Sequence, residues 1–158
     1  MTELLTHRGY HIKNRKGLKH WEPLLEEWLL CIERYCRVAQ GEDAPFEYTE
    51  RANIGLLAGA AWRCGRVALE EFQYQKGYKN KKKWNGRADL YLASEDTDEM
   101  IEGKFAWLSL SSTSTAQKRI ESTLSVSLRY ARKTKGVHEG TTCLGFACMP
   151  PRIPAHHP

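Results

Sequence analysis

Two alternating segments between residues 84 and 108 constrain the fold more than any other feature of the sequence. The first runs for about seven residues from Arg87 and places Asp89 opposite a row of apolar side chains. The second runs from 100 to 108, and Glu102 and Lys104 point to the same side of it. If the two strands form a β-hairpin, the two carboxylates and the lysine can converge.

This combination of side chains is typical of a metal site. Mg²⁺ prefers oxygen ligands and commonly takes one or two carboxylates together with water and phosphate oxygens. Asp89 and Glu102 can supply such ligands. An ammonium two residues further on, at Lys104, can stabilise developing phosphate charge or orient an attacking water. Alternatively, the hairpin is an ordinary half-exposed β-ribbon whose charged side chains are solvated and have no special function.

The spacing of Asp89, twelve residues and Glu102-x-Lys104 resembles the signature of the PD-(D/E)XK nuclease superfamily. The resemblance implies an α/β fold with a restriction-endonuclease-like core of helix, three strands, helix and strand, in which helices flank a mixed sheet. It also implies a Mg²⁺-dependent nuclease, with Mn²⁺ as a substitute, that hydrolyses phosphodiester bonds by water attack. Asp89 and Glu102 would bind the metal, with Lys104 as a catalytic residue. DNA is the favoured substrate, and endonuclease cleavage is favoured by analogy alone.

The sequence departs from the superfamily pattern at two points, of which the first is a frequent variation and the second limits how far the resemblance extends. Ala88 stands where many members have proline. A Gln-x-x-x-Tyr pattern that some branches carry is missing, because Gln117 and Tyr130 lie too far apart. The resemblance therefore supports the superfamily and no particular branch.

Members of the superfamily often have a further catalytic glutamate on the first core helix, and two adjacent candidates are present here. Apolar spacing predicts a long helix from about 49 to 75 that contains both Glu70 and Glu71. Helical phase places Glu71 at the border of the buried face and Glu70 nearly opposite it. We therefore expect Glu71 to be the catalytic residue.

A lysine-rich stretch precedes the hairpin and favours a nucleic-acid-binding loop. It carries no acidic residue, and it is followed by Trp84. Such a loop can contact phosphates, although an isolated lysine run is more often only solvated. The predicted nucleic-acid-binding residues are Lys79, Lys81, Lys82, Lys83 and Arg87.

The length of 158 residues and the 41% hydrophobic content fit one compact unit. We expect a basic arm and an accessory amphipathic helix in 1–45, a nuclease-like core in 46–150 and a Pro-rich tail in 151–158. The added N-terminal helix should run from 21 to 39. Within the core we expect a first strand over 79–84, a type I′ turn at Asn85–Gly86, a helix over 114–134 and a last strand over 141–149.

Cysteine content and hydropathy favour a cytoplasmic location without membrane association. The five cysteines form no disulfide or zinc pattern and are expected to be free thiols. No stretch approaches eighteen apolar residues, and the N-terminus lacks the apolar centre of a secretory signal. A homodimer or a larger complex is left open.

Two other classes of function fit the same residues. One is a catalytically silent protein of nuclease fold that binds or regulates nucleic acid or a protein partner through its Trp-rich first helix. The other is an unrelated α/β interaction domain, in which the alignment of Asp89 with Lys104 is accidental.

Overall fold

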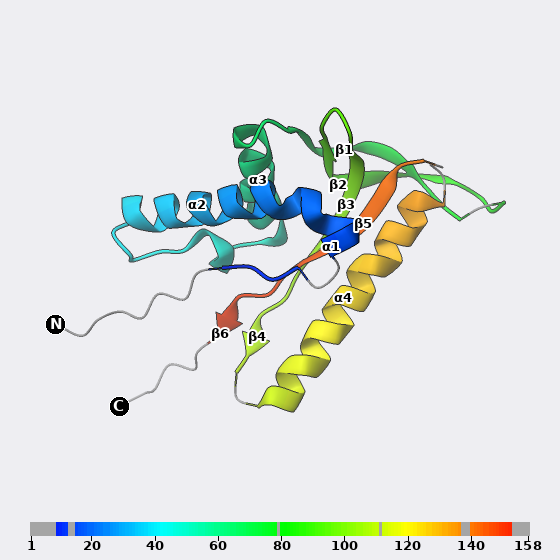
Figure 1. The fold of residues 1–158 in the computed structure, drawn as a ribbon. Coiled ribbons are helices and arrows are strands. Elements are labelled where there is room, and N and C mark those ends of the chain that lie inside the picture. Colours follow the sequence, from blue (N-terminus) through cyan, green and yellow to red (C-terminus); the bar gives the residue numbers. More distant parts are fainter. Residues whose placement is uncertain (1–8, 13–14, 79, 111, 137–139, 153–158) are drawn as a thin grey trace.

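The computed structural model describes residues 9–12, 15–78, 80–110, 112–136 and 140–152. Figure 1 shows a central sheet with α2 (Glu22–Val38) and α3 (Glu50–Arg63) on one side and α4 (Thr113–Lys135) on the other. The expected α/β class, a mixed sheet flanked by helices, is confirmed. Among the described helices, none is both long and apolar enough to cross a membrane.

The N-terminal part is more helical than expected. The predicted basic arm contains α1 (Arg15–Leu18), followed by the 3₁₀ helix η1 (Lys19–Trp21). Helix α2 matches the predicted amphipathic helix and begins with Pro23 in its first turn, where a missing N–H costs nothing. A second 3₁₀ helix, η2 (Pro45–Glu47), leads into α3.

The predicted helix over 49–75 is wrong beyond Arg63, because Gly65 ends it. Gly65 has φ +80°, a left-handed conformation that glycine adopts without a steric penalty. The N–H of Arg66 donates to Ala61 O at 2.9 Å, which completes a Schellman cap. The chain then continues as the strand β1 (Val67–Lys76).

The main sheet has the order β1-β2-β3-β5 and contains both strand directions. Antiparallel pairs join β1 to β2 (Trp84–Ala93) and β2 to β3 (Asp98–Phe105). A parallel pair joins β3 to β5 (Thr142–Cys148), and α4 makes the crossover. Short strands β4 (Leu108–Ser109) and β6 (Pro151–Arg152) form a separate parallel pair.

The predicted hairpin is confirmed as β2 and β3, but the strand expected over 79–84 is wrong. Asn85 and Gly86 lie inside β2, where they pair with Gln75 and Tyr74 of β1. The turn lies instead in the lysine-rich residues between β1 and β2. Strand β3 also ends at Phe105, earlier than expected, and Trp107 is 40% exposed.

Helix α4 matches the predicted helix to within a residue at each end and packs directly on the last strand. A Cβ at Gly145 would lie 2.6 Å from Ser127 Oγ and 2.8 Å from Leu128 N. The absence of a side chain at Gly145 therefore sets how closely α4 approaches β5.

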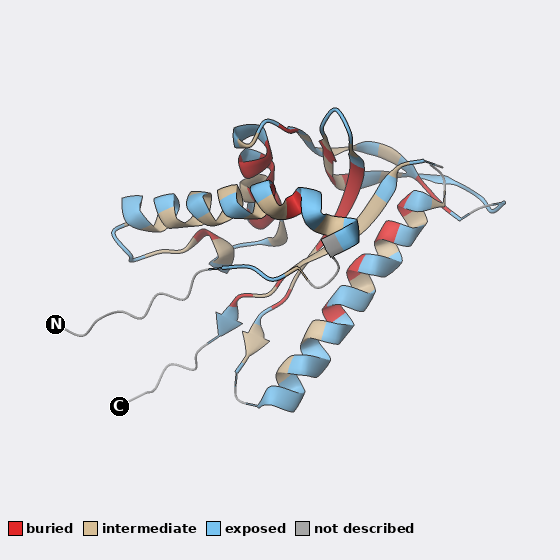
Figure 2. Ribbon diagram, viewed as in Figure 1, coloured by how far each residue is buried: buried red, intermediate tan, exposed pale blue. Residues whose placement is uncertain are grey.

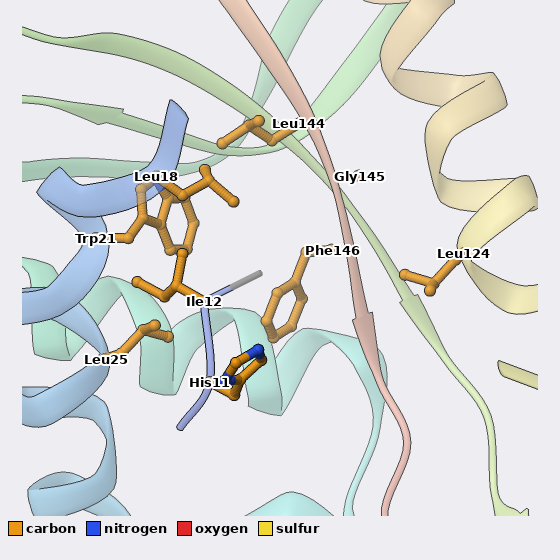
Figure 3. Close-up of a pocket in the computed structure, with 9 residues that line it drawn as sticks. All are labelled: His11, Ile12, Leu18, Trp21, Leu25, Leu124, Leu144, Gly145 and Phe146. Carbon is orange, nitrogen blue, oxygen red and sulfur yellow. The ribbon is translucent and has the colours of Figure 1, made fainter. Parts of the chain in front are cut away.

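The hydrophobic core lies between α3 and the sheet. Fully buried Leu57 of α3 belongs to one cluster with Leu90, Leu92 and Ile101, as the alternation of the hairpin predicts. Figure 2 shows these buried segments facing inward, while the outer surfaces of α2 and α4 are largely exposed. An apolar cavity of about 520 Å³ extends from this region past Phe146 of β5 toward Leu124 of α4 (Figure 3).

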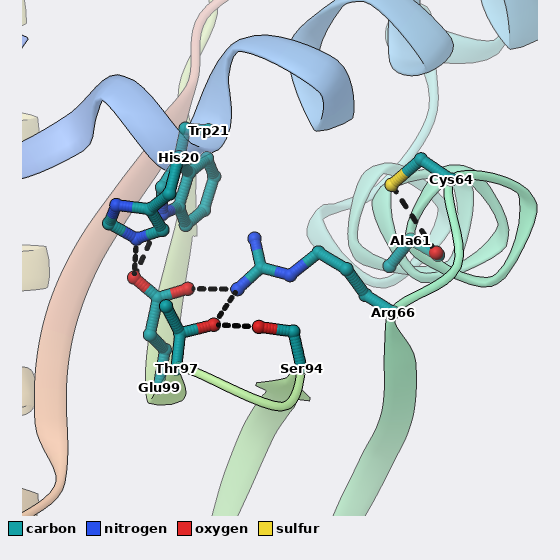
Figure 4. A network of polar contacts seen from close by, with 8 residues as sticks. All are labelled: His20, Trp21, Ala61, Cys64, Arg66, Ser94, Thr97 and Glu99. Atoms are coloured by element: carbon teal, nitrogen blue, oxygen red, sulfur yellow. Dashed lines mark hydrogen bonds and ion pairs between the residues drawn. The ribbon is translucent and has the colours of Figure 1, made fainter.

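A buried carboxylate attaches the N-terminal helices to the sheet. Glu99 Oε1 accepts hydrogen bonds from His20 Nε2 at 2.8 Å and Trp21 Nε1 at 2.9 Å. Its other oxygen, Oε2, accepts from Arg66 Nη2 at 2.5 Å (Figure 4). Because the Glu99 side chain is only 2% exposed, these donors replace the water that its charge loses on burial.

Candidate functional site

The candidate site lies where the pairing between β2 and β3 ends. The ladder stops at the pair Leu90 and Ile101. Beyond this pair, the side chain of Asp89, the residue before Leu90, replaces the backbone as the partner of β3. Its Oδ2 accepts a hydrogen bond from Gly103 N at 2.8 Å. Gly103 stands between Glu102 and Lys104, so Asp89 meets β3 in the middle of the predicted motif.

Lys104 joins this point to the start of α3. Its Nζ donates to Glu50 Oε1 at 3.0 Å and Oε2 at 3.2 Å, and also to the carbonyl oxygen of Gly103. On its other side, Nζ lies 5.2 Å from the centre of the Tyr130 ring of α4. The ammonium is thus held between the two helical layers.

Glu50 reaches Lys104 because α3 begins there. Thr49 is the N-cap, and its side-chain oxygen accepts a hydrogen bond from Ala52 N. An acidic residue in the first turn also interacts favourably with the helix dipole. Glu50 was not predicted as a site residue. The pattern Thr49-Glu50, a recognisable helix start, is the sequence signal that could have indicated it.

A cavity of about 320 Å³ opens beside these residues. Asp89 and Glu50 both line it, together with Arg87. Within the described part of the chain, Asp89 has no ion-pair partner, whereas Glu50 is paired with Lys104. The full lining is Thr49, Glu50, Arg51, Ile54, Glu71, Arg87 and Asp89.

Glu71 lies in this cavity for a different reason from the one predicted. It belongs to β1 rather than to a helix, and its φ of +50° interrupts the ladder opposite Asp89. Its carboxylate lies 3.0 Å from Arg87 Nη1 and 3.6 Å from Arg51 Nε. Neighbouring Glu70 is exposed and does not line the cavity. The helical argument for choosing Glu71 was wrong, and its catalytic role stays a prediction.

Glu102 does not join Asp89 in the cavity. As expected, it points to the same side of β3 as Lys104, toward α4. There its Oε1 accepts from Thr134 Oγ1 at 2.8 Å, and Lys76 Nζ lies 2.7 Å from Oε1 and 2.8 Å from Oε2. The Glu102 side chain is 2% exposed. To bind a metal beside Asp89, Glu102 would have to leave both partners.

The oxygen donors around the cavity match the chemistry that Mg²⁺ prefers, but they are paired with cations or N–H groups. Among the described residues, no three His, Cys, Asp or Glu side chains come together as a group that could hold a metal ion. Asp89 is the carboxylate of the cavity that lacks a neutralising cation among these residues. Glu50 also lines the cavity, and a metal bound there would share this carboxylate with Lys104.

The lysine-rich loop lies at the far end of the β1 and β2 hairpin, next to the end of α4 (Figure 1). Lys81, Lys82 and Lys83 are exposed, as a phosphate-binding loop requires. Predicted residue Lys79 lies outside the described residues. Arg87, the fifth predicted binding residue, is paired with Glu71 at the cavity.

Comparison of the chain with protein-family models, with curated proteins and with solved structures finds no match.

Proposed function

We propose that this protein is a metal-dependent nuclease with a restriction-endonuclease-like core. The supporting observation is the position of the motif in the fold. Helix α3, strands β1 to β3, helix α4 and strand β5 follow the order that the resemblance implies. Asp89 on the second strand contacts the E-x-K segment on the third strand, and Glu50 of the first core helix contacts the lysine of that segment.

In this proposal, Asp89 and Glu50 hold Mg²⁺ or Mn²⁺ at the cavity. When bound, the metal supplies Lewis acidity toward a phosphate oxygen and lowers the pKa of a coordinated water. Lys104 stabilises the negative charge that develops on the phosphate, and it is positioned for this by Glu50 and the Tyr130 ring. Glu71 fixes Arg87 at the rim, where the guanidinium can meet a phosphate.

Glu102 acts as a positioning residue in this arrangement. Its ion pair with Lys76 and its hydrogen bond with Thr134 connect β3, β1 and α4 directly behind the motif. The prediction that Glu102 is a metal ligand is replaced in our proposal by Glu50, which lines the cavity with Asp89.

The test is hydrolysis of single- and double-stranded DNA and RNA in Mg²⁺, Mn²⁺ or EDTA. We expect cleavage with either metal and none with EDTA. Asp89→Asn, Glu50→Gln and Lys104→Gln should each lower turnover by about 100-fold or more, since each removes a charge from the reacting centre. The matched controls Asp96→Asn, Glu47→Gln and Lys118→Gln change exposed charges elsewhere and should keep full activity. Cleavage in EDTA, or by Asp89→Asn at the wild-type rate, would refute the proposed mechanism.

A second candidate is a protein of the same fold that binds without turnover. The pairing of Glu102 with Lys76 favours it, because this buried ion pair occupies the glutamate of the motif. This candidate predicts nucleic-acid binding in EDTA and no cleavage with either metal, so the same assay separates the two functions.

A further inference from the structure

Two exposed aromatic rings flank the lysine-rich loop. Tyr78 follows the end of β1, and Trp84 begins β2; they are 42% and 41% exposed. Large aromatic side chains on a surface leave apolar area in contact with water, and such groups are common where a ligand covers them.

Lysine ammonium groups lie over both rings. Lys81 Nζ is 5.9 Å from the centre of the Tyr78 ring, and Lys133 Nζ is 6.0 Å from that of Trp84. Lys133 Nζ also lies 4.6 Å from the Tyr130 ring, which contacts Lys104 of the candidate site. Alternating rings and ammonium groups therefore lead from Lys104 to the loop. We call these residues, Lys104, Tyr130, Lys133, Trp84, Tyr78 and Lys81, the aromatic track.

The loop end of the track is fixed to α4 by backbone contacts. Gly77 N donates to Lys133 O at 3.0 Å. A Cβ at Gly136 would lie 2.5 Å from Gly77 O and 3.0 Å from Tyr78 Cα. Since both contacts involve main-chain atoms next to Tyr78, the ring is presented from a defined position, which lowers the entropy cost of binding.

The sequence around the loop end of the track contains no acidic residue, whereas Lys104, at the other end, is paired with Glu50. Neither the stretch from 72 to 88 nor the stretch from 122 to 138 includes Asp or Glu. A polyanion can therefore approach the loop end of the track without repulsion from neighbouring acidic residues, and a ligand with flat apolar faces can stack on Trp84 and Tyr78 there. Nucleic acid has both properties, but in a duplex the base faces are covered by neighbouring base pairs. Only unpaired bases can stack on Trp84 and Tyr78.

We infer that the aromatic track binds single-stranded nucleic acid, with unpaired bases on Trp84 and Tyr78 and phosphates on the adjacent lysines. This inference deepens the proposed function, on which it rests for the position of the scissile phosphate at Lys104. Binding itself does not need turnover and can be measured without metal.

The experiment is fluorescence anisotropy of labelled twelve-nucleotide DNA and RNA single strands, and of the DNA duplex, with the full chain in EDTA. We expect tighter binding to the single strands than to the duplex. Trp84→Leu and Tyr78→Leu should each weaken single-strand binding by about 5- to 150-fold, the range measured for loss of one stacked base. Trp84→Phe should retain most of the affinity because it keeps an aromatic face.

Two further variants separate stacking from charge. Lys82→Gln should weaken binding to single strand and duplex alike and reduce the log–log salt slope by about 0.7 to 0.9. Trp62→Leu removes a ring that is 59% exposed on α3, across the sheet, and should change no affinity. Circular dichroism and thermal unfolding confirm that each variant is folded.

Equal or tighter duplex binding, or unchanged single-strand affinity in Trp84→Leu, overturns the inference. Displacement of the single strand by polyglutamate at equal charge also overturns it, because the surface then recognises any polyanion. Single-strand binding without cleavage in Mg²⁺ or Mn²⁺ refutes the nuclease while supporting the track. Metal-dependent cleavage without a binding preference for single strands supports the nuclease and refutes the role of the aromatic track. The DNA and RNA arms show which sugar is accepted.

Discussion

Replacing Glu102 by glutamine tests whether this residue is a buried anchor or an open metal ligand. The side chains of Lys76 and Glu102 are 9% and 2% exposed, and their charged atoms lie 2.7 Å apart. Glu102→Gln keeps the volume but leaves the Lys76 ammonium without a countercharge. Removing one partner of a buried pair costs about 3 to 5 kcal/mol. With a urea m-value of roughly 2 kcal/mol/M for a chain of this size, the unfolding midpoint should fall by about 1.5 to 2.5 M.

The assay is urea unfolding, followed in parallel by far-UV circular dichroism and tryptophan fluorescence in EDTA. Lys76→Met/Glu102→Leu should recover most of the lost stability, because replacing both charges by apolar groups is close to neutral. Asp89→Asn is the matched control, since its amide oxygen can still accept the hydrogen bond of Gly103, and its midpoint should move little. Two results together would contradict our assignment of Glu102. In EDTA, Glu102→Gln would unfold at the same urea concentration as the wild type; with Mg²⁺, it would lack a stabilisation that the wild type gains.

Three further predictions concern packing, acid stability and thiol chemistry. Gly145→Ala should destabilise the fold because its Cβ would clash with Ser127 Oγ. Gly59→Ala, on the exposed surface of α3, should stabilise the fold by about 0.5 to 1 kcal/mol. Thermal unfolding measures both effects. Hydrogen bonds from Tyr48 and Tyr35 lower the pKa of Asp43, so its contribution to stability is present above about pH 4 and is lost as pH falls further. Asp43→Asn should flatten the pH dependence of unfolding in that range, and an unchanged profile would contradict this. Burial raises the pKa of Cys148 to about 11. In the native protein this thiol should therefore react with a disulfide reagent at pH 8 only after unfolding. Prompt labelling of Cys148, identified by peptide mapping, would argue against that burial.

The sequence predicted those elements whose pattern is set by neighbouring residues. Alternation placed Leu90 and Leu92 on the buried face of β2, and helical spacing located α2 and α4. The boundary after α3 was missed because apolar helical spacing was extended across Gly65 to residue 75. Only the conformation of Gly65 distinguishes a cap from an interior glycine, and that depends on the carbonyl groups it faces.

The candidate site was predictable only in part, for a similar reason. Asp89 meets the Glu102-x-Lys104 segment at the Gly103 N–H because both lie on one hairpin, so local pattern was enough to predict that approach. Glu50 meets Lys104 from a helix 54 residues away, and Lys76 reaches Glu102 across 26 residues. Both contacts depend on how layers and strands are arranged, and that arrangement carries no short sequence signature.

The parallel pairing of β3 with β5 has a consequence for how the chain folds. Strands β1, β2 and β3 are neighbours along the chain, so they can pair after closing short loops. The pair Glu99 and Thr142 forms only after the segment that contains α4 has crossed the sheet. Long-range parallel contacts of this kind form slowly. We expect pulsed hydrogen exchange during refolding to protect the amides of β2 before those of β5, with β3 exposing an unpaired edge in the interval. Simultaneous protection of β2 and β5 would show that the sheet assembles in one step.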